Sequence, residues 1–216
     1  MPSMWTQLET AHRGCDVLEH AFYRRWSRGE LEREELAVYA GQYLHAARAL
    51  ADALDEAAEK SPPDYQWPIA EHAWEEHHHV RLWEDFARAV GAPAKAPAEP
   101  ETAAFVAALV DGDRDWMATL LAVYAIESTQ APVATAKRDG LIRFYGIDSA
   151  GALAYFTAHT HRDDEHAAQV RRLVGPRVES CDEPRLVAAA QRAWRGNWTL
   201  LDGVERVSGA AGTAGQ

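Results

Sequence analysis

The residues best suited to chemistry lie in the stretch YFTAHTHRDDEHAAQVRRL, which runs from Tyr155 to Leu173. His159, Asp163 and His166 stand there at spacings of i, i+4 and i+7. At roughly 100° per residue, a helix places these three side chains within a sector about 60° wide. Two imidazoles and a carboxylate on one stripe are typical transition-metal ligands in helical bundles. The alternative is a solvated polar face, since charged residues flank all three.

A second candidate ligand is a single carboxylate in an otherwise apolar segment. Glu127 directly follows the residues LLAVYAI. Burying a lone carboxylate is costly unless it is paired or bound to a metal. We therefore predict that Glu127 belongs to the same site, with a solvent-exposed position at a helix end as the alternative.

The segment EHAWEEHHH, residues 71–79, offers more candidate ligands than one site can use. On a helix, positions 72, 75, 76 and 79 share one face, and positions 71, 75 and 78 share the next. The three consecutive histidines cannot all point inward, so at least one is expected at the surface. One carboxylate and one imidazole from this segment would complete a set that suits two irons better than one zinc, because it is rich in carboxylates and has more than four ligands.

Composition restricts the class of protein. The chain of 216 residues fits one domain and is rich in good helix formers, without alternating strand patterns, so we predict an all-α fold. The net charge of −11 argues against nucleic acid or a membrane surface as a partner. Cys15 and Cys181 form no CxxC motif, and we find no signal peptide or membrane span. We therefore expect a cytoplasmic protein.

The hydrophobic pattern predicts a bundle of seven helices in a single domain, residues 1–207, with a disordered tail at 208–216. Pro132 is expected to kink the fifth helix, and Gly146 to end it. An Ala- and Pro-rich loop at 91–100 is too short to separate two domains. The expected helices span about 5–26, 32–59, 66–90, 101–110, 113–145, 155–173 and 183–207.

Four motifs together resemble the heme-oxygenase-like diiron oxidases, and within them the Chlamydia protein associating with death domains and its bacterial relatives. The resemblance covers about residues 18–173. It implies the seven-helix bundle shared with TenA-type thiaminases and with the pyrroloquinoline quinone synthase, which generally lack the HxxxDxxH set. The four motifs are LEHAFYRRWSRGEL, HVRLWEDFARAVG, YAIESTQAPVATAKRDGL and LAYFTAH with the aspartate and histidine that follow it.

Position by position, the resemblance implies that Glu127, His159, Asp163 and His166 are iron ligands. It also implies a cofactor of two non-heme irons, with O₂ as co-substrate and an external reductant. Trp83 then has two interpretations, as an electron relay or as a packing residue, and we favour packing.

The family's third-helix ligands are a Glu and, seven residues later, a His that precedes x-x-Leu-Trp. That histidine is His79 in this sequence, and His72 stands where the Glu is expected. Pairing Glu71 with His79 requires one extra residue, whereas pairing Glu71 with His78 shifts the register. We favour Glu71 and His79, and His78 and Glu75 stay open as alternatives.

One branch of the family makes 4-aminobenzoate from its own side chains, with a tyrosine as the source of the ring and a lysine as the amino donor. Tyr23 and Lys137 stand at the corresponding positions. Against this assignment, Ile126 precedes Glu127 where that branch has a tyrosine. The lysine also recurs in relatives that oxidise external substrates.

The sequence therefore supports three functional hypotheses. The first is a 4-aminobenzoate synthase that consumes Tyr23 and Lys137, and the second is an oxidase of the same scaffold acting on a small external amine or amino acid. The third is a non-catalytic interaction protein, which we rank last because burying so many ionisable groups without a metal is destabilising. The sequence leaves open whether two copies of the chain form a homodimer.

Overall fold

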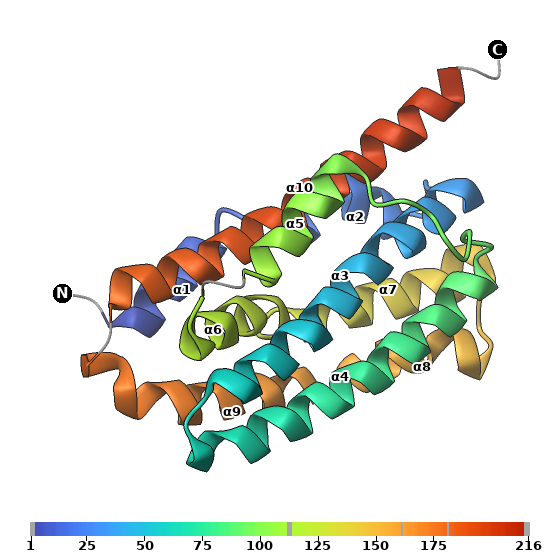
Figure 1. Ribbon diagram of the computed structural model, residues 1–216. Helices are drawn as coiled ribbons and strands as arrows, with labels where there is room; N and C mark the ends of the chain where they lie inside the picture. The colour runs from blue at the N-terminus through green and yellow to red at the C-terminus, as the bar shows by residue number, and fades with distance from the viewer. Residues whose placement is uncertain (1–2, 112–113, 161, 181, 214–216) are drawn as a thin grey trace.

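The computed structural model describes residues 3–111, 114–160, 162–180 and 182–213 (Figure 1). These residues contain helices and no strand, which confirms the predicted all-α fold. The helices are α1 (Met4–His12), α2 (Ala21–Trp26), α3 (Arg33–Lys60), α4 (Pro63–Ala89), α5 (Pro100–Leu109), α6 (Trp116–Glu127), α7 (Gln130–Tyr145), α8 (Ala150–His159), α9 (Arg162–Val174) and α10 (Glu183–Thr213), with short 3₁₀ turns η1 (Val17–Glu19) and η2 (Gly175–Ser180).

Three of the predicted helices are divided in the structure. The first becomes α1, η1 and α2, because the side chains of Asp16 and His20 accept hydrogen bonds from the backbone and begin new helical turns. The fifth becomes α6 and α7, and Pro132 lies in the first turn of α7, where a missing N–H group is tolerated, rather than at a kink. The sixth becomes α8 and α9, so His159 and His166 lie on different helices.

α3 and α4 form an antiparallel pair along one side of the bundle (Figure 1). Pro63 begins α4 at a position where proline is favoured. The indole of Trp83 on α4 is fully buried and donates a hydrogen bond of 2.8 Å to the carbonyl of Ala40 on α3. This bond fixes the rotation of α4 against α3 and therefore decides which face of α4 points into the bundle.

The apolar helix α6 lies at the centre and packs against α10, α3 and α9. Every residue of α6 is buried, including Glu127 at its last position. Asp115 begins the helix by accepting hydrogen bonds from the backbone of Met117 and Ala118. Because α6 is surrounded on all sides, it carries the Glu127 carboxylate into the interior.

α2 and α7 approach each other unusually closely. A Cβ atom at Gly140 would lie 2.6 Å from the indole of Trp26, so glycine is required at this crossing. The Trp26 indole also donates a hydrogen bond of 3.1 Å to the backbone carbonyl of Lys137. These contacts hold the Lys137 backbone in place against α2.

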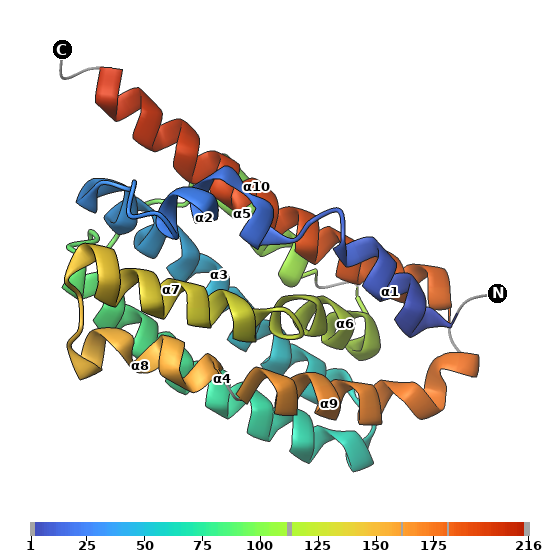
Figure 2. The same cartoon turned by 180° about the vertical axis from the view of Figure 1, so that it is seen from behind.

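α8 and α9 follow one another along α4 on the face seen in Figure 2. Gly146, with a φ of +64°, ends α7 as predicted. Ser149 then caps α8 by accepting a hydrogen bond from the Ala152 backbone. This turn places His159, at the end of α8, opposite α4.

α10 crosses the bundle and continues past the other helices (Figures 1 and 2). It ends at Thr213, so the helix extends beyond the end expected at Val207. The disorder predicted for residues 208–216 stays a prediction. Among the described residues, no helix is both long enough and apolar enough to cross a membrane.

Candidate metal centre

Two buried groups of histidines and carboxylates meet between α4, α6, α8 and α9. In each group, one donor atom from every member lies within 4.8 Å of the others. Glu76 belongs to both groups, so they form one continuous cluster. The first group is His72, Glu76, Glu127 and His166, and the second is Glu76, His79 and His159.

α4 supplies three of these side chains from a single face. His72, Glu76 and His79 follow one another at helical spacing, and each is at least 94% buried. His72 Nε2 lies 2.6 Å from Glu127 Oε1, and His79 Nδ1 lies 2.7 Å from Glu76 Oε1. The cluster is thus already paired, with each of these two carboxylates next to an imidazole.

The cluster fits a metal ion because two of its donor atoms are buried without hydrogen bonds. Within the described part of the chain, Glu127 Oε2 and His166 Nδ1 have no hydrogen-bond partner. Buried polar atoms without partners are rare in proteins, and a bound ion is one of the groups that can satisfy them. Buried carboxylate oxygens and imidazole nitrogens are also ligands that iron accepts.

Glu75 fixes the orientation of His166 from outside the cluster. Glu75 Oε2 lies 2.9 Å from His166 Nε2, while the other ring nitrogen lies 3.5 Å from Glu127 Oε1. Metal-binding histidines commonly donate their second N–H group to a carboxylate in this way. The arrangement leaves His166 Nδ1 as the atom that faces the cluster.

The electrostatics of the cluster keep its carboxylates ionised despite burial. Burial raises the pKa of Glu76, but the hydrogen bond and charge of His79, together with the charge of His159, outweigh it and lower the pKa to about 2. The pKa of Glu127 is also lowered, because His72 and His166 outweigh the effect of burial. Burial lowers the pKa of His166, but the carboxylates around it raise that pKa to about 9. A divalent cation would displace the proton that His166 holds.

The structure brings together four of the predicted ligands, Glu127, His79, His159 and His166. It does not bring in Glu71, which is exposed on the neighbouring face of α4. The other two candidates on α4, His78 and Glu75, also lie outside the two groups. Asp163 lies within α9, but its side chain is outside the described residues.

His72 and Glu76 are the residues that the sequence prediction did not choose. Both share a helical face with His79, so the signal was present in the spacing. The prediction selected Glu71 because the resemblance calls for a carboxylate about seven residues before the histidine. The structure instead has a histidine at that position and a carboxylate one turn later. Metal binding by all of these residues stays a prediction.

Lys137 occupies a second buried site, which is lined by aromatic rings. Its side chain is 1% exposed, and its Nζ atom lies 5.0 to 5.9 Å from five ring centroids. The rings exclude water and present their negative faces to the amino group. They belong to Tyr23, Tyr39, Tyr43, Trp83 and Phe156.

Tyr23 and Tyr39 are joined within this ring-lined site. Their hydroxyl oxygens lie 2.7 Å apart. Burial raises the pKa of both phenols well above the usual value, so both stay protonated at neutral pH. The two residues predicted to serve as ring source and amino donor, Tyr23 and Lys137, therefore share one buried site.

Aromatic packing connects this site to the metal centre. The ring of Tyr155 lies 4.1 Å from that of His159 and 4.7 Å from that of Trp83, measured between centroids. Trp83 also contacts Tyr43 at 4.6 Å. Trp83 packs between the two sites, and electron transfer through it stays a prediction.

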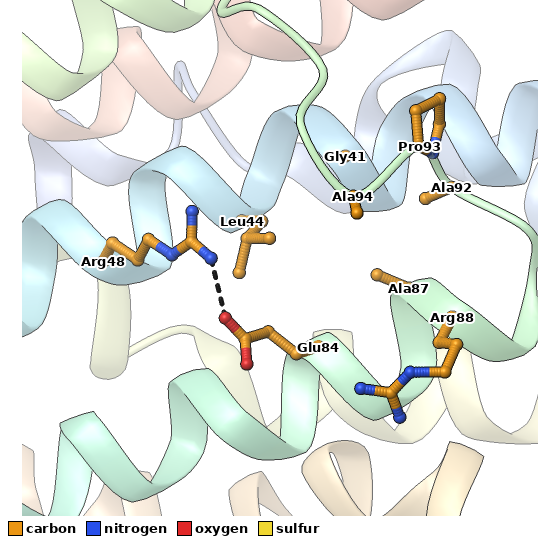
Figure 3. Close-up of a pocket in the computed structure, with 9 residues that line it drawn as sticks. All are labelled: Gly41, Leu44, Arg48, Glu84, Ala87, Arg88, Ala92, Pro93 and Ala94. Carbon is orange, nitrogen blue, oxygen red and sulfur yellow. Dashed lines mark hydrogen bonds and ion pairs between the residues drawn. The ribbon is translucent and has the colours of Figure 1, made fainter.

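A surface cavity of about 240 Å³ lies between α3 and α4, apart from the metal cluster. Figure 3 shows Arg48 and Glu84 pointing toward each other across it, with 2.7 Å between guanidinium and carboxylate. Arg88 lies on the same rim. None of the described residues that line this cavity belongs to either group of the metal cluster.

Comparison with known proteins decides the family. Residues 37–198 match the iron-containing redox enzymes, which is well over half of the chain. The chain belongs to this family. The buried cluster of histidines and glutamates fits the iron that the family's description names.

Members of named function support the same assignment. The 4-aminobenzoate synthase of Nitrosomonas europaea is 28% identical, over 92% of this chain and 89% of the relative. The 4-aminobenzoate synthase of Chlamydia trachomatis is 26% identical, over 91% and 89% respectively.

Solved structures confirm the predicted heme-oxygenase-like fold. A TenA homologue from Pseudomonas syringae superposes with a TM-score of 0.83 at 13% identity, covering 95% of this chain and 93% of that one. A CADD-like protein of unknown function from Nostoc punctiforme gives a TM-score of 0.71 at 15% identity, covering 93% and 98%. At these identities the likeness shows the fold alone.

Proposed function

We propose that this protein is an O₂-dependent diiron enzyme that forms 4-aminobenzoate from its own Tyr23 and Lys137. The observation that carries the proposal is the burial of Lys137 and Tyr23 in one ring-lined site, which Trp83 and Tyr155 connect to the metal cluster. The named relatives, which are 4-aminobenzoate synthases, support the same product.

The cluster would hold the metal through two overlapping sets of ligands. His72, Glu127 and His166 would hold one ion, His79 and His159 would hold the other, and Glu76 belongs to both groups. When bound, the iron would activate O₂ and supply the oxidising power for the reaction. Every other contribution comes from the side chains themselves.

The product's carbon skeleton matches the side chain of Tyr23. The ring and carboxyl carbon of 4-aminobenzoate correspond to the ring and Cβ of tyrosine. The Cα–Cβ bond of Tyr23 therefore breaks, Cα takes up a hydrogen to leave a glycine residue, and Cβ is oxidised to the carboxylate. The phenolic oxygen leaves as water, and a C–N bond to the nitrogen of Lys137 takes its place as the Cε–Nζ bond breaks and Cε is oxidised to an aldehyde. O₂ is the oxidant, and an external reductant supplies the remaining electrons for its reduction to water.

The protein's part in this reaction is to position the reacting groups and exclude water. The Tyr39 hydroxyl holds that of Tyr23 by a hydrogen bond and so fixes the ring. The Trp26 indole holds the Lys137 backbone, and the surrounding rings confine the amino group. Confinement of this kind replaces a bimolecular encounter by a fixed geometry.

The test is isotopic labelling of the protein itself. Protein grown with ¹³C-tyrosine and ¹⁵N-lysine is loaded anaerobically with Fe(II), given a reductant and exposed to O₂. We expect 4-aminobenzoate that carries both labels, at no more than about one molecule per chain, and an intact mass reduced at Tyr23 and Lys137. Unlabelled or catalytic amounts of product would contradict the self-consuming reaction.

A second candidate function is oxidation of a small external amine or amino acid on the same scaffold. It is favoured by Ile126, a buried residue that stands next to Glu127 where the 4-aminobenzoate branch is expected to have a tyrosine. The same experiment separates the two functions. An external substrate would leave the mass of the chain unchanged and would support many turnovers.

A further inference from the structure

A cavity of about 170 Å³ lies between α4 and α9 and leads from the surface to the metal cluster. Its inner wall includes His72 and His166, which are 2% and 6% exposed. Both belong to the first group of candidate ligands. The cavity is therefore a path from solvent to buried donor atoms.

The wall of this cavity is strongly acidic. Glu71, Glu75 and Glu165 contribute three carboxylates, and Arg172 contributes the single guanidinium among the described residues that line the cavity. Glu71 and Glu165 are exposed. The pocket between α3 and α4 has two arginines against one glutamate, so the acidic character does not extend to every cavity of this protein.

Within the part of the chain that the structure describes, two atoms of the metal cluster behind the cavity lack hydrogen bonds. His166 lines the cavity, and among the described residues its Nδ1 atom has no hydrogen-bond partner. Glu127 Oε2, in the same cluster, also has none. The acidic wall and these buried atoms are independent observations: the wall attracts cations, and the buried atoms include types of ligand that bind them.

We propose that Glu71, Glu75 and Glu165 form an inlet through which divalent cations reach the metal centre. A cleft lined by one sign of charge concentrates counter-ions and raises their association rate by about tenfold or more at low ionic strength. Glu71, which the sequence prediction placed among the metal ligands, acts here at the approach to the site. This proposal rests on the proposed metal centre.

The test measures the rate of metal uptake, without turnover. Metal-free protein is mixed with Co(II) in a stopped-flow instrument, and the visible absorbance of bound Co(II) is followed at several salt concentrations. In the variant Glu71→Gln/Glu165→Gln, we expect association to slow by about fivefold to tenfold at low salt and its salt dependence to weaken. The final absorbance should equal that of the unsubstituted protein, because the candidate ligands are intact.

Two further variants make the outcome specific. Arg172→Gln removes the guanidinium that the described residues contribute to the wall and should accelerate uptake. Glu34→Gln/Asp148→Asn removes two exposed carboxylates that lie outside the cavity and changes the net charge equally. This control should leave uptake close to that of the unsubstituted protein.

The results separate the inlet from the metal centre itself. The inlet proposal is overturned if the cavity variant and the control take up Co(II) at the same rate, or if Arg172→Gln slows uptake. If the unsubstituted protein binds no Co(II) at all, both the inlet and the metal centre are overturned.

Discussion

Replacing Lys137 should affect product formation without lowering the unfolding free energy, so it separates the two effects. Methionine has a similar length and no charge, so Lys137→Met keeps the volume of the ring-lined site filled. We expect the unfolding free energy to be unchanged or to rise by about 1 kcal/mol, because a buried polar group is replaced by an apolar one. We expect formation of 4-aminobenzoate to fall below detection. Urea denaturation and product analysis measure the two effects, and Lys95→Met, at an exposed loop position, is the control.

The hydrogen-bonded hydroxyl groups of Tyr23 and Tyr39 allow a second test of the roles of single residues. Tyr23→Phe and Tyr39→Phe remove the same hydrogen bond, so each should lower the unfolding free energy by about 1 kcal/mol. Only Tyr23→Phe should abolish the product, because the phenolic carbon of Tyr23 is the proposed site of C–N bond formation. Equal loss of product in both variants would argue that the two phenols serve the reaction jointly.

Helix packing sets the position of these residues, and the crossing of α2 and α7 depends on Gly140. Gly140→Ala places a Cβ atom about where the Trp26 indole lies, so α2 must move away from α7. We expect a loss of about 1–3 kcal/mol in unfolding free energy, as for other overpacked interiors. Gly151→Ala in α8 meets nothing within 4 Å and should instead stabilise the protein by about 0.5–1 kcal/mol. Urea denaturation of both variants compares a close helix crossing with an open helix position.

The contact between α4 and α9 makes the unfolding free energy of the metal-free protein depend on pH. The folded protein holds the pKa of His166 at about 9, above the ordinary value of 6.5, because carboxylates of α4 and α6 outweigh burial. A raised pKa stabilises the folded state fully below pH 6.5, and this contribution disappears as the pH rises through 9. Urea denaturation at pH 6 and pH 9 should therefore show a lower unfolding free energy at pH 9. His166→Gln should reduce this difference. An equal change in unfolding free energy between pH 6 and pH 9 in both proteins would show that His166 is not its source.

The helices show what their sequence could and could not specify. Glu127 could be predicted because a lone carboxylate in an apolar run has few stable environments. The break between His159 and His166 could not, because the residues around it contain no glycine or proline and keep helical spacing. The choice of His72 and Glu76 over Glu71 depends on how α4 is rotated about its axis. That rotation is set by tertiary contacts, such as the hydrogen bond from Trp83 to the Ala40 carbonyl, which no local pattern encodes.

For the molecule as a whole, the candidate metal ligands come from α4, α6, α8 and α9, so metal binding and folding must be coupled. An ion that binds only the folded chain stabilises it by about 2.7 kcal/mol when its concentration is a hundred times the dissociation constant. Thermal unfolding with and without anaerobic Fe(II) should show this increase in the unsubstituted protein.

The same measurement distinguishes the ligands predicted from the sequence from those that the structure brings together. Glu76→Gln removes a carboxylate common to both groups, so it should abolish most of the stabilisation by Fe(II). Glu71→Gln changes an exposed residue outside both groups and should keep the full equilibrium stabilisation, even though metal uptake is slower. If the two variants exchanged these behaviours, the bound protein would use the other face of α4, and α4 would have to rotate on binding metal. Such a rotation would break the hydrogen bond between the Trp83 indole and the Ala40 carbonyl, which makes it energetically unfavourable.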